Sequence, residues 1–528
     1  MTETKPIPDM ADQRDGIPHS RGLVHEGLWI ILLTSASKVL GIAREGLLAW
    51  AFGTSAIVDA LRVAQSGTLL IIHLLAGSVL DSAFLPTFKH LIAQRRTRLA
   101  WRAVTLAARA LAIAGGVLCL ALLLGGRVWT RLLAPGFDAT RLGYAALFLA
   151  AMSPAVPLMF GANLLATVSS ALYRFRLPAL RALVQNVVIL AGTIAAVAIG
   201  ARVLPGRAIL PIGLALPIAQ GILLIILLRS LRSHARPVAR GTPDRDRLLW
   251  TLLGTALAPG FALVLTEQAT VIVERVVASR LSEGSIASLD YARFLVETPL
   301  VTVGVGITQT LLPTLSDLSA AGERERFINS IRTLLLACLW ALLPLSVWLL
   351  AFGEDLIRLI YAHGAFGEAS VQTTTAALAG FAIGLWAWFG GTILQRAFYA
   401  QRRLRILLPL AITSLVAFAV LSFLWAPSMG VRGVSTAFSV ANILFFSGSL
   451  AFLGWELARA VLPILAYLLA GGGLLYLAGS GIVPQGPPIV RLVAGAALIL
   501  LAWIGWTAVN PATRRLASGL IHTLRRKT

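Results

Sequence analysis

Charged residues are scarce in this sequence. Only 13% of its 528 residues are Asp, Glu, Lys or Arg, whereas 57% are hydrophobic. Soluble domains carry roughly 25% charged residues, so the composition excludes a soluble protein with a large core. Apolar runs near or above the roughly 20 residues that cross a bilayer recur along the whole chain. Short segments of alternating hydrophobicity, typical of a membrane β-barrel, are not found. The sequence therefore predicts an all-α polytopic membrane protein.

Residues that usually carry enzyme chemistry are also few. The two cysteines, Cys119 and Cys338, each lie inside an apolar run and have no metal-site or disulfide spacing. The sequence contains no phosphate-binding glycine loop, no His/Cys metal spacing and no nucleophile elbow. We therefore expect no enzyme, no cofactor and no metal, although Na⁺, H⁺ or the membrane potential could drive a transport step.

Acidic residues are the rarer of the two charged classes, at 23 against 45 Lys and Arg, which leaves a net charge of +22. The basic residues cluster in short connections between about fourteen apolar spans, where membrane topology and anionic headgroups require them. This placement argues against nucleic acid as a partner. The connections on one side carry most of the basic residues, although "GGRVWTRLLAPGFDATR" (125–141) on the other side is an exception with three arginines. The bias predicts a multi-pass protein with both termini in the cytoplasm.

Short segments recur at similar offsets. "AFLPTFKHL" (83–91) returns as "TLLPTLSDL" (310–318), and "ALYRFRL" (171–177) returns as "AFYAQRRL" (397–404). Such a repeat predicts two parallel six-helix lobes related by an axis along the membrane normal, an architecture of transporters. The predicted domains are a cytoplasmic tail (1–23), the two lobes (24–232 and 248–454), two additional helices (457–511) and a basic cytoplasmic tail (512–528).

Two predicted spans, 56–84 and 285–316, each carry a polar stripe. On a helical wheel the stripe of the first falls within about 100° and comprises Asp59, Arg62, Ser66, His73, Gly77 and Asp81. The second repeats it with Asp290, Arg293, Glu297, Gly304 and Thr308. A charge at the bilayer centre costs at least about 2.5–3.5 kcal/mol, so these stripes should face protein or water. They predict a hydrated cavity between the lobes near mid-membrane.

The cations in that region predict an anionic cargo. Arginine suits phosphate because its planar guanidinium donates two hydrogen bonds and stays charged when desolvated. The expected substrate-binding residues are Lys38, Arg44, Asp59, Arg62 and Arg293. The expected coupling or cavity-lining residues are Glu45, His73, Asp290 and Glu297. A structural alternative stays open, because Asp59 with Arg62, and Asp290 with Arg293, could each form a local ion pair. Glu274 and Arg275 could lie near the outer surface.

The segment "SKVLGIAREGLLAWAFGTSAIVDAL" (37–61) resembles the first-hairpin signature of the MviN/MurJ family. "SAFLPTF", "LAPGFDA", "EGSIASLDYA" and "TQTLLPTLS" are similar to further family segments in the same order, and the resemblance covers roughly 25–455. It implies a fold of the multidrug/oligosaccharidyl-lipid/polysaccharide exporter superfamily. It also implies flipping of lipid II, an undecaprenyl-diphosphate-linked precursor of peptidoglycan, in the bacterial inner membrane.

Position by position, Arg44 and Asp59 match the family pattern. Lys38 stands where an arginine is usual, and Glu45 where an aspartate is usual. Ile72 and Phe294 stand where the family has functionally important arginines, and Arg293 precedes the second of these positions by one residue, a rotation of about 100° on a helix. The resemblance also implies that the last two spans form a groove for the lipid tail.

The sequence leaves three functions open. The first is a flippase for an undecaprenyl-diphosphate-linked glycan, either lipid II or an exopolysaccharide unit, working by alternating access as a monomer among membrane lipids. The second is a cation-coupled antiporter for drugs or solutes, which would need acidic rather than cationic cavity residues. The third is a membrane scaffold without transport, for which Ile72 and Phe294 are the best argument.

Overall fold

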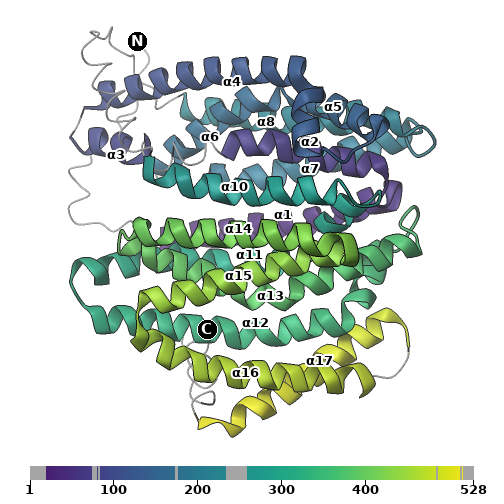
Figure 1. The fold of residues 1–528 in the computed structure, drawn as a ribbon. Helices are drawn as coiled ribbons and strands as arrows, with labels where there is room; N and C mark the ends of the chain where they lie inside the picture. The colour runs from purple at the N-terminus through teal and green to yellow at the C-terminus, as the bar shows by residue number, and fades with distance from the viewer. Residues whose placement is uncertain are drawn as a thin grey trace.

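The computed structural model describes residues 20–73, 80, 84–94, 96–172, 176–232, 258–482, 486–511 and 514. These residues form helices and short connections, without a β-strand in the described part (Figure 1). The first half of the chain contains α1 (Ser20–Phe52), α2 (Ala56–Ile72), α3 (Leu85–Ala93), α4 (Thr97–Leu133), α5 (Ala139–Met152), α6 (Ala155–Ala171), α7 (Arg176–Ala198), the 3₁₀ turn Pro205–Ala208 and α8 (Ile209–Leu231).

The second half contains six helices, and two more follow it. These are α10 (Ala258–Ala278), α11 (Ser285–Ala320), α12 (Arg324–Tyr361), α13 (Glu368–Ala400), α14 (Leu404–Met429), α15 (Val431–Leu453), α16 (Trp455–Ile482) and α17 (Pro488–Val509). The predicted tails 1–23 and 512–528 lie almost entirely outside the described residues, as do Gly77 and Asp81 of the first polar stripe. The side chains of Gly304 and Thr308 are also outside the described part.

Nine helices of the described chain are long and apolar enough to cross a membrane. A tenth span is the pair α5 and α6, which meet at a 44° bend. The bend falls at Ser153 and Pro154, because proline cannot donate the backbone hydrogen bond that would continue a helix. Helices α1, α2, α10 and α11 carry the intramembrane charges and are not among these ten, but they occupy the other four positions of the fourteen spans predicted. The all-α membrane fold is confirmed.

The two halves repeat the same packing pattern. In the first half α1 packs on α7, α2 on α5, α4 on α6, and α8 on both α6 and α7. In the second half α10 packs on α14, α11 on α13, α12 on α13, and α15 on both α13 and α14. Each pair of the first half therefore has a counterpart among the corresponding spans of the second, as the sequence repeat predicts. The contacts between the halves come from α1, α2 and α4 against α10, α11 and α12 (Figure 1).

Helix α13 forms the centre of the second half because small residues let its neighbours approach closely. Gly380 and Gly384, four residues apart, face Ser435 and Ser439 of α15. The Ser439 hydroxyl donates to the Gly380 carbonyl at 2.6 Å, and it accepts from the Gly384 amide at 3.0 Å. Small residues at such spacing are a common way to join membrane helices. The close contact brings the aromatic side chains of α13 and α15 together.

The last two helices pack on α12. The indole of Trp503 donates to the Trp340 carbonyl at 3.0 Å, and the indole of Trp348 donates to the Leu492 carbonyl at 3.2 Å. Arg491 of α17 pairs with Asp355 at 3.1 Å. Helices α16 and α17 therefore lie on the outside of the second half, at the lower edge in Figure 1. Their expected role as a groove for a lipid tail stays a prediction.

Candidate functional site

Four arginines and three carboxylates form a connected network where the two halves meet. The arginines are Arg44, Arg62, Arg275 and Arg293, and the carboxylates are Glu45, Glu274 and Asp290. They come from α1, α2, α10 and α11, the four long helices that carry the intramembrane charges. Four positive and three negative charges leave the network with one excess positive charge.

In the first half, Glu45 is the centre of the network. Its side chain is only 3% exposed, and it binds Arg44 at 2.5 Å and Arg62 through its other oxygen. Asn186 of α7 accepts a hydrogen bond from Arg44 at 2.9 Å, and its amide donates to the Ser37 carbonyl at 2.8 Å. Arg44 is thereby fixed between a charged and a neutral acceptor, and 19% of its side chain stays exposed.

The link between the halves runs through Asp290 of α11. Arg275 of α10 donates to both carboxylate oxygens of Asp290, at 2.7 and 2.9 Å. Arg62 of α2 approaches the same carboxylate at 3.6 Å and lies over the ring of Tyr291. Arg275 also donates to the hydroxyl of Ser66 on α2 at 2.9 Å. Two arginines from different halves therefore share one carboxylate, so any movement that separates the halves must break these contacts.

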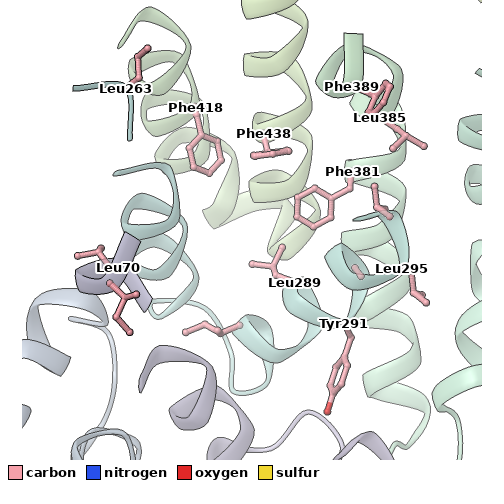
Figure 2. Close-up of a cluster of buried hydrophobic side chains, with 14 of the residues drawn as sticks. Leu70, Leu263, Leu289, Tyr291, Leu295, Phe381, Leu385, Phe389, Phe418 and Phe438 are labelled. Atoms are coloured by element: carbon pink, nitrogen blue, oxygen red, sulfur yellow. The ribbon is translucent and has the colours of Figure 1, made fainter. Parts of the chain in front are cut away.

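Arg293 completes the network on the side of the second half. It pairs with Glu274, which is buried, and its guanidinium lies 4.8 Å from the ring centres of both Phe381 and Phe438. The two rings meet edge to face at 5.5 Å (Figure 2). Cation–π contacts of this kind stabilise a desolvated guanidinium by roughly 2 kcal/mol. Arg293 is thus held by one carboxylate and two aromatic faces, with 20% of its side chain exposed.

The local ion pairs considered as an alternative do not form in the described chain. Asp59 accepts hydrogen bonds from the backbone amides of Gly284 and Ala287, at 2.7 and 2.8 Å, instead of binding Arg62. It therefore caps the N-terminus of α11, where backbone amides lack partners within the helix and the helix dipole favours an anion. Gly284 has a φ of +85°, and an added Cβ would collide with Thr54. Asp59 joins the halves directly and is nearly fully buried.

The connections around Asp59 form what we call the closed end, comprising 53–56, 134–138, 279–284 and 362–367. Across it, the Ala365 amide donates to the Trp50 carbonyl at 2.8 Å, and the Gly136 amide donates to the Ser279 hydroxyl at 3.1 Å. The Ala56 amide donates to Glu283 at 2.7 Å. These contacts cross between the halves, at the right of Figure 1. The protein is therefore shut at this end.

The network lies nearer to the closed end than the mid-membrane site we expected. Glu45 is seven residues from the end of α1, and Asp290 is five residues from the start of α11. At about 1.5 Å per residue, both lie roughly 10 Å from the helix ends. The network does not line any of three cavities found in the described chain, of about 420, 220 and 520 Å³. In this conformation each arginine of the network is paired with a carboxylate. The sequence predicted that these arginines would line an open, hydrated chamber.

The other predicted site residues lie around the network. Lys38 of α1 is half-buried and its charge attracts that of Glu297 on α11. Glu297 has no hydrogen-bond or ion-pair partner in the described chain. His73 directly follows α2 and is exposed, and the charge that acts on it is that of Arg181 on α7, outside the network.

The two departures from the family pattern are apolar contacts in the structure. Ile72 is buried. The ring of Phe294 on α11 lies beside Gly41 of α1. Neither position can supply a positive charge. Arg62 lies ten residues before Ile72, about 15 Å along α2, so it does not restore a charge at the level of Ile72.

Sequence reasoning missed three members of the site. Glu274 and Arg275 were expected near the outer surface, yet both are buried and join the network. Their adjacency on an apolar span was a signal, because two neighbouring charges on a membrane helix rarely face lipid. Asn186 follows another amide, Gln185, in a long apolar helix, and only its contact with Arg44 identifies it.

Known proteins resemble this chain over most of its length. The model of the family described as lipid II flippase MurJ matches residues 48–482. A probable lipid II flippase MurJ of Rhizobium tropici is 27% identical over 465 residues, covering 84% of this chain and 85% of that protein. The lipid II flippase MurJ of Burkholderia cenocepacia is 26% identical, covering 80% and 81%.

Two solved structures show the same fold. A lipid II flippase MurJ in an inward closed conformation has a TM-score of 0.74 at 20% identity, covering 91% of this chain and 98% of that one. An inward-facing multidrug resistance transporter of the MATE family, a member of the MOP superfamily, has a TM-score of 0.67 at 12% identity, covering 80% and 95%.

Proposed function

The chain belongs to the lipid II flippase MurJ family, and from this premise we propose that it flips an undecaprenyl-diphosphate-linked glycan precursor across the bacterial inner membrane. The cargo is lipid II or a related lipid-linked oligosaccharide, moved from the inner to the outer leaflet by alternating access. The observation that carries the proposal is the buried arginine network at the contact of the two halves. The proposal includes cytoplasmic termini, which the distribution of basic connections supports, and action as a monomer.

The network suits a diphosphate because its arginines are held by exchangeable carboxylates. A diphosphate offers several anionic oxygens, and guanidinium groups bind such oxygens in a bidentate manner. When the cargo replaces Asp290 as the partner of Arg62 and Arg275, the contact between the halves breaks. Cargo binding is thereby coupled to separation of the halves, which is what alternating access requires. The glycan would lie in the space that opens, while the polyprenyl tail stays in lipid.

The same charges disfavour a drug antiporter for cationic compounds. The excess charge of the network is positive, and a cationic cargo would have to displace arginines from their carboxylates. A lipid-linked exopolysaccharide unit stays as the second candidate, because its diphosphate would bind the same arginines. Only the glycan differs between the two cargoes, and the described contacts do not involve glycan-binding groups.

The proposal is tested in a strain depleted of its own lipid II flippase. We expect the wild-type chain to restore growth and Arg44→Glu or Arg293→Glu to abolish rescue, because a reversed charge repels the diphosphate and its neighbouring carboxylate. Arg432→Glu is the matched control, since Arg432 is exposed at the start of α15 and outside the network. Growth with both reversed variants at normal expression would refute the proposed site. Failure of the wild-type chain in the presence of a correctly inserted protein would point to the exopolysaccharide unit.

Ion coupling is proposed at Glu297. Of the four carboxylates predicted for substrate binding, coupling or cavity lining, Glu45, Asp59 and Asp290 are engaged by arginines or by the start of α11. Glu297 forms no ion pair in the described chain. Arg293 and, more weakly, Lys38 attract its charge, and Asp290 and Glu274 repel it, so it is available to take up H⁺ or Na⁺.

The coupling proposal predicts that Glu297→Gln makes flipping in proteoliposomes independent of imposed pH and Na⁺ gradients. Flipping driven by wild-type protein should change several-fold with one of these gradients. Glu267→Gln is a control, because Glu267 lines a cavity of the second half to which Glu297 does not contribute. A variant at Glu297 that keeps the full gradient response would exclude this residue.

A further inference from the structure

The 125–141 segment, with its three arginines on the side that otherwise carries few, is not used by the proposed transport mechanism. Arg141 is explained locally, because it pairs with Asp138 at 3.3 Å and lies over the ring of Phe137. The backbone amide of Arg141 also binds Asp138 and lowers the pKa of that carboxyl below its usual range. Arg127 and Arg131 have no such partners in the described chain, and both are exposed. Their positive charge therefore has no internal explanation.

Most other arginines near the closed end are engaged in some contact, whereas the side chain of Arg432 at the start of α15 is exposed without one in the described chain. Arg202 lies over the ring of Trp50, Arg280 lies over the ring of Phe423, and Arg491 pairs with Asp355. Arg358 binds Glu354 and Glu368 at 2.8 and 2.6 Å. The unpartnered state of Arg127 and Arg131 is thus not a general property of this face of the molecule.

Arg127 and Arg131 lie one helical turn apart and line one cavity of about 520 Å³. Its other walls are Val128 and Leu132 of α4, and Ala139, Leu142 and Gly143 of α5. Two guanidinium groups beside an apolar surface suit an amphiphile, because the guanidinium groups can bind its anionic headgroup and the apolar surface can contact its hydrocarbon chains.

The outer face of α4 continues that apolar floor along the helix. Its exposed aliphatic side chains recur every three or four residues and therefore form one stripe: Ile113, Val117, Leu120, Leu124 and Val128. Leu124 is 81% exposed, and α4 lies along an outer edge of the bundle in Figure 1. With 37 residues, α4 is about 55 Å long, longer than the roughly 30 Å hydrocarbon core. The helix is therefore long enough for its last two turns, which carry both arginines, to extend beyond that core.

We propose that the cavity between α4 and α5 binds the headgroup of an anionic glycerophospholipid. Arg127 and Arg131 bind the phosphate, and the acyl chains lie along the exposed stripe of α4. The lipid belongs to the leaflet at the closed end, which the proposed orientation makes the outer one. The lipid site contains no residue of the arginine network. The proposal therefore does not depend on which cargo the network binds.

The test is native mass spectrometry of the full-length protein in detergent, with phosphatidylglycerol and phosphatidylcholine added in equal amounts. Wild-type protein should retain phosphatidylglycerol in preference to phosphatidylcholine. Each basic residue near an anionic lipid contributes about fivefold to affinity, so Arg127→Gln and Arg131→Gln should each weaken retention by about fivefold. The double variant should lose the preference. Arg432→Gln, which removes an exposed arginine from another helix at the same end, should retain it.

Three results would overturn the proposal. The first is equal retention of phosphatidylglycerol by the wild type and a double variant whose unfolding temperature is unchanged. The second is displacement of the lipid by millimolar inorganic phosphate, which would identify a site for free phosphate. The third is displacement by undecaprenyl diphosphate at equimolar amounts, which would assign the cavity to the cargo. A loss of preference in the double variant, with the lipid resistant to both competitors, supports the assignment.

Discussion

Replacing Arg62 by glutamine is expected to abolish flipping and to destabilise the protein by about 3 kcal/mol, because removal of one partner leaves buried carboxylates without full compensation. Arg62 contacts Glu45 and approaches Asp290 at 3.6 Å, and only 10% of its side chain is exposed. Flipping should fall at least about 100-fold if the guanidinium is worth roughly 3 kcal/mol to a bound diphosphate. Flipping of a labelled lipid-linked precursor in proteoliposomes and thermal unfolding measure the two effects.

A double variant separates the two roles of Arg62. Glu45→Gln combined with Arg62→Gln removes both members of the pair, so stability should recover to within about 1 kcal/mol of wild type. Flipping should not recover, since the cargo still lacks a cation. Recovery of flipping would show that Arg62 only neutralises Glu45 and does not contact the cargo. Full activity of the single variant would remove Arg62 from the site altogether.

Replacing Asp59 by alanine is expected to shift the protein from the closed to the open arrangement by about 100-fold. The carboxylate binds two backbone amides at the start of α11, and loss of a buried helix cap costs about 1–3 kcal/mol. A change of about 2.8 kcal/mol corresponds to 100-fold in the equilibrium. Asp59→Asn keeps one acceptor oxygen and should shift it by about tenfold.

Pulsed electron paramagnetic resonance measures this shift. Spin labels at Thr140→Cys and His363→Cys report on the closed end, because both positions are accessible at the surface and belong to different halves. In Asp59→Ala a longer distance should dominate, whereas wild-type protein should show mainly the short one. An unchanged distance distribution would mean that the remaining contacts, such as Trp50 with Ala365, hold the closed end without Asp59.

Much of the fold was predictable because hydropathy and helical periodicity are local properties. The bend at Pro154, the pairing of the two halves and the polar stripes on α2 and α11 all follow from residues within one span or from the repeat. The family resemblance of residues 37–61 identifies Arg44 and Asp59 from the sequence alone. The sequence could not identify the hydrogen-bond and ion-pair partners of these two residues. Each polar stripe contains several carboxylates and arginines that could form the same kinds of contact.

The sequence by itself determined that this protein is a bundle of membrane helices with two related halves and charged stripes turned away from lipid. Its composition leaves no other way to bury the apolar surface, and a charge facing lipid would be too costly. Only the tertiary structure decided that Asp59 caps α11 instead of pairing with Arg62, and that Arg275 meets Asp290. Those contacts join residues from separate helices, so they depend on how the helices are placed relative to one another, and several pairings would have balanced the same charges.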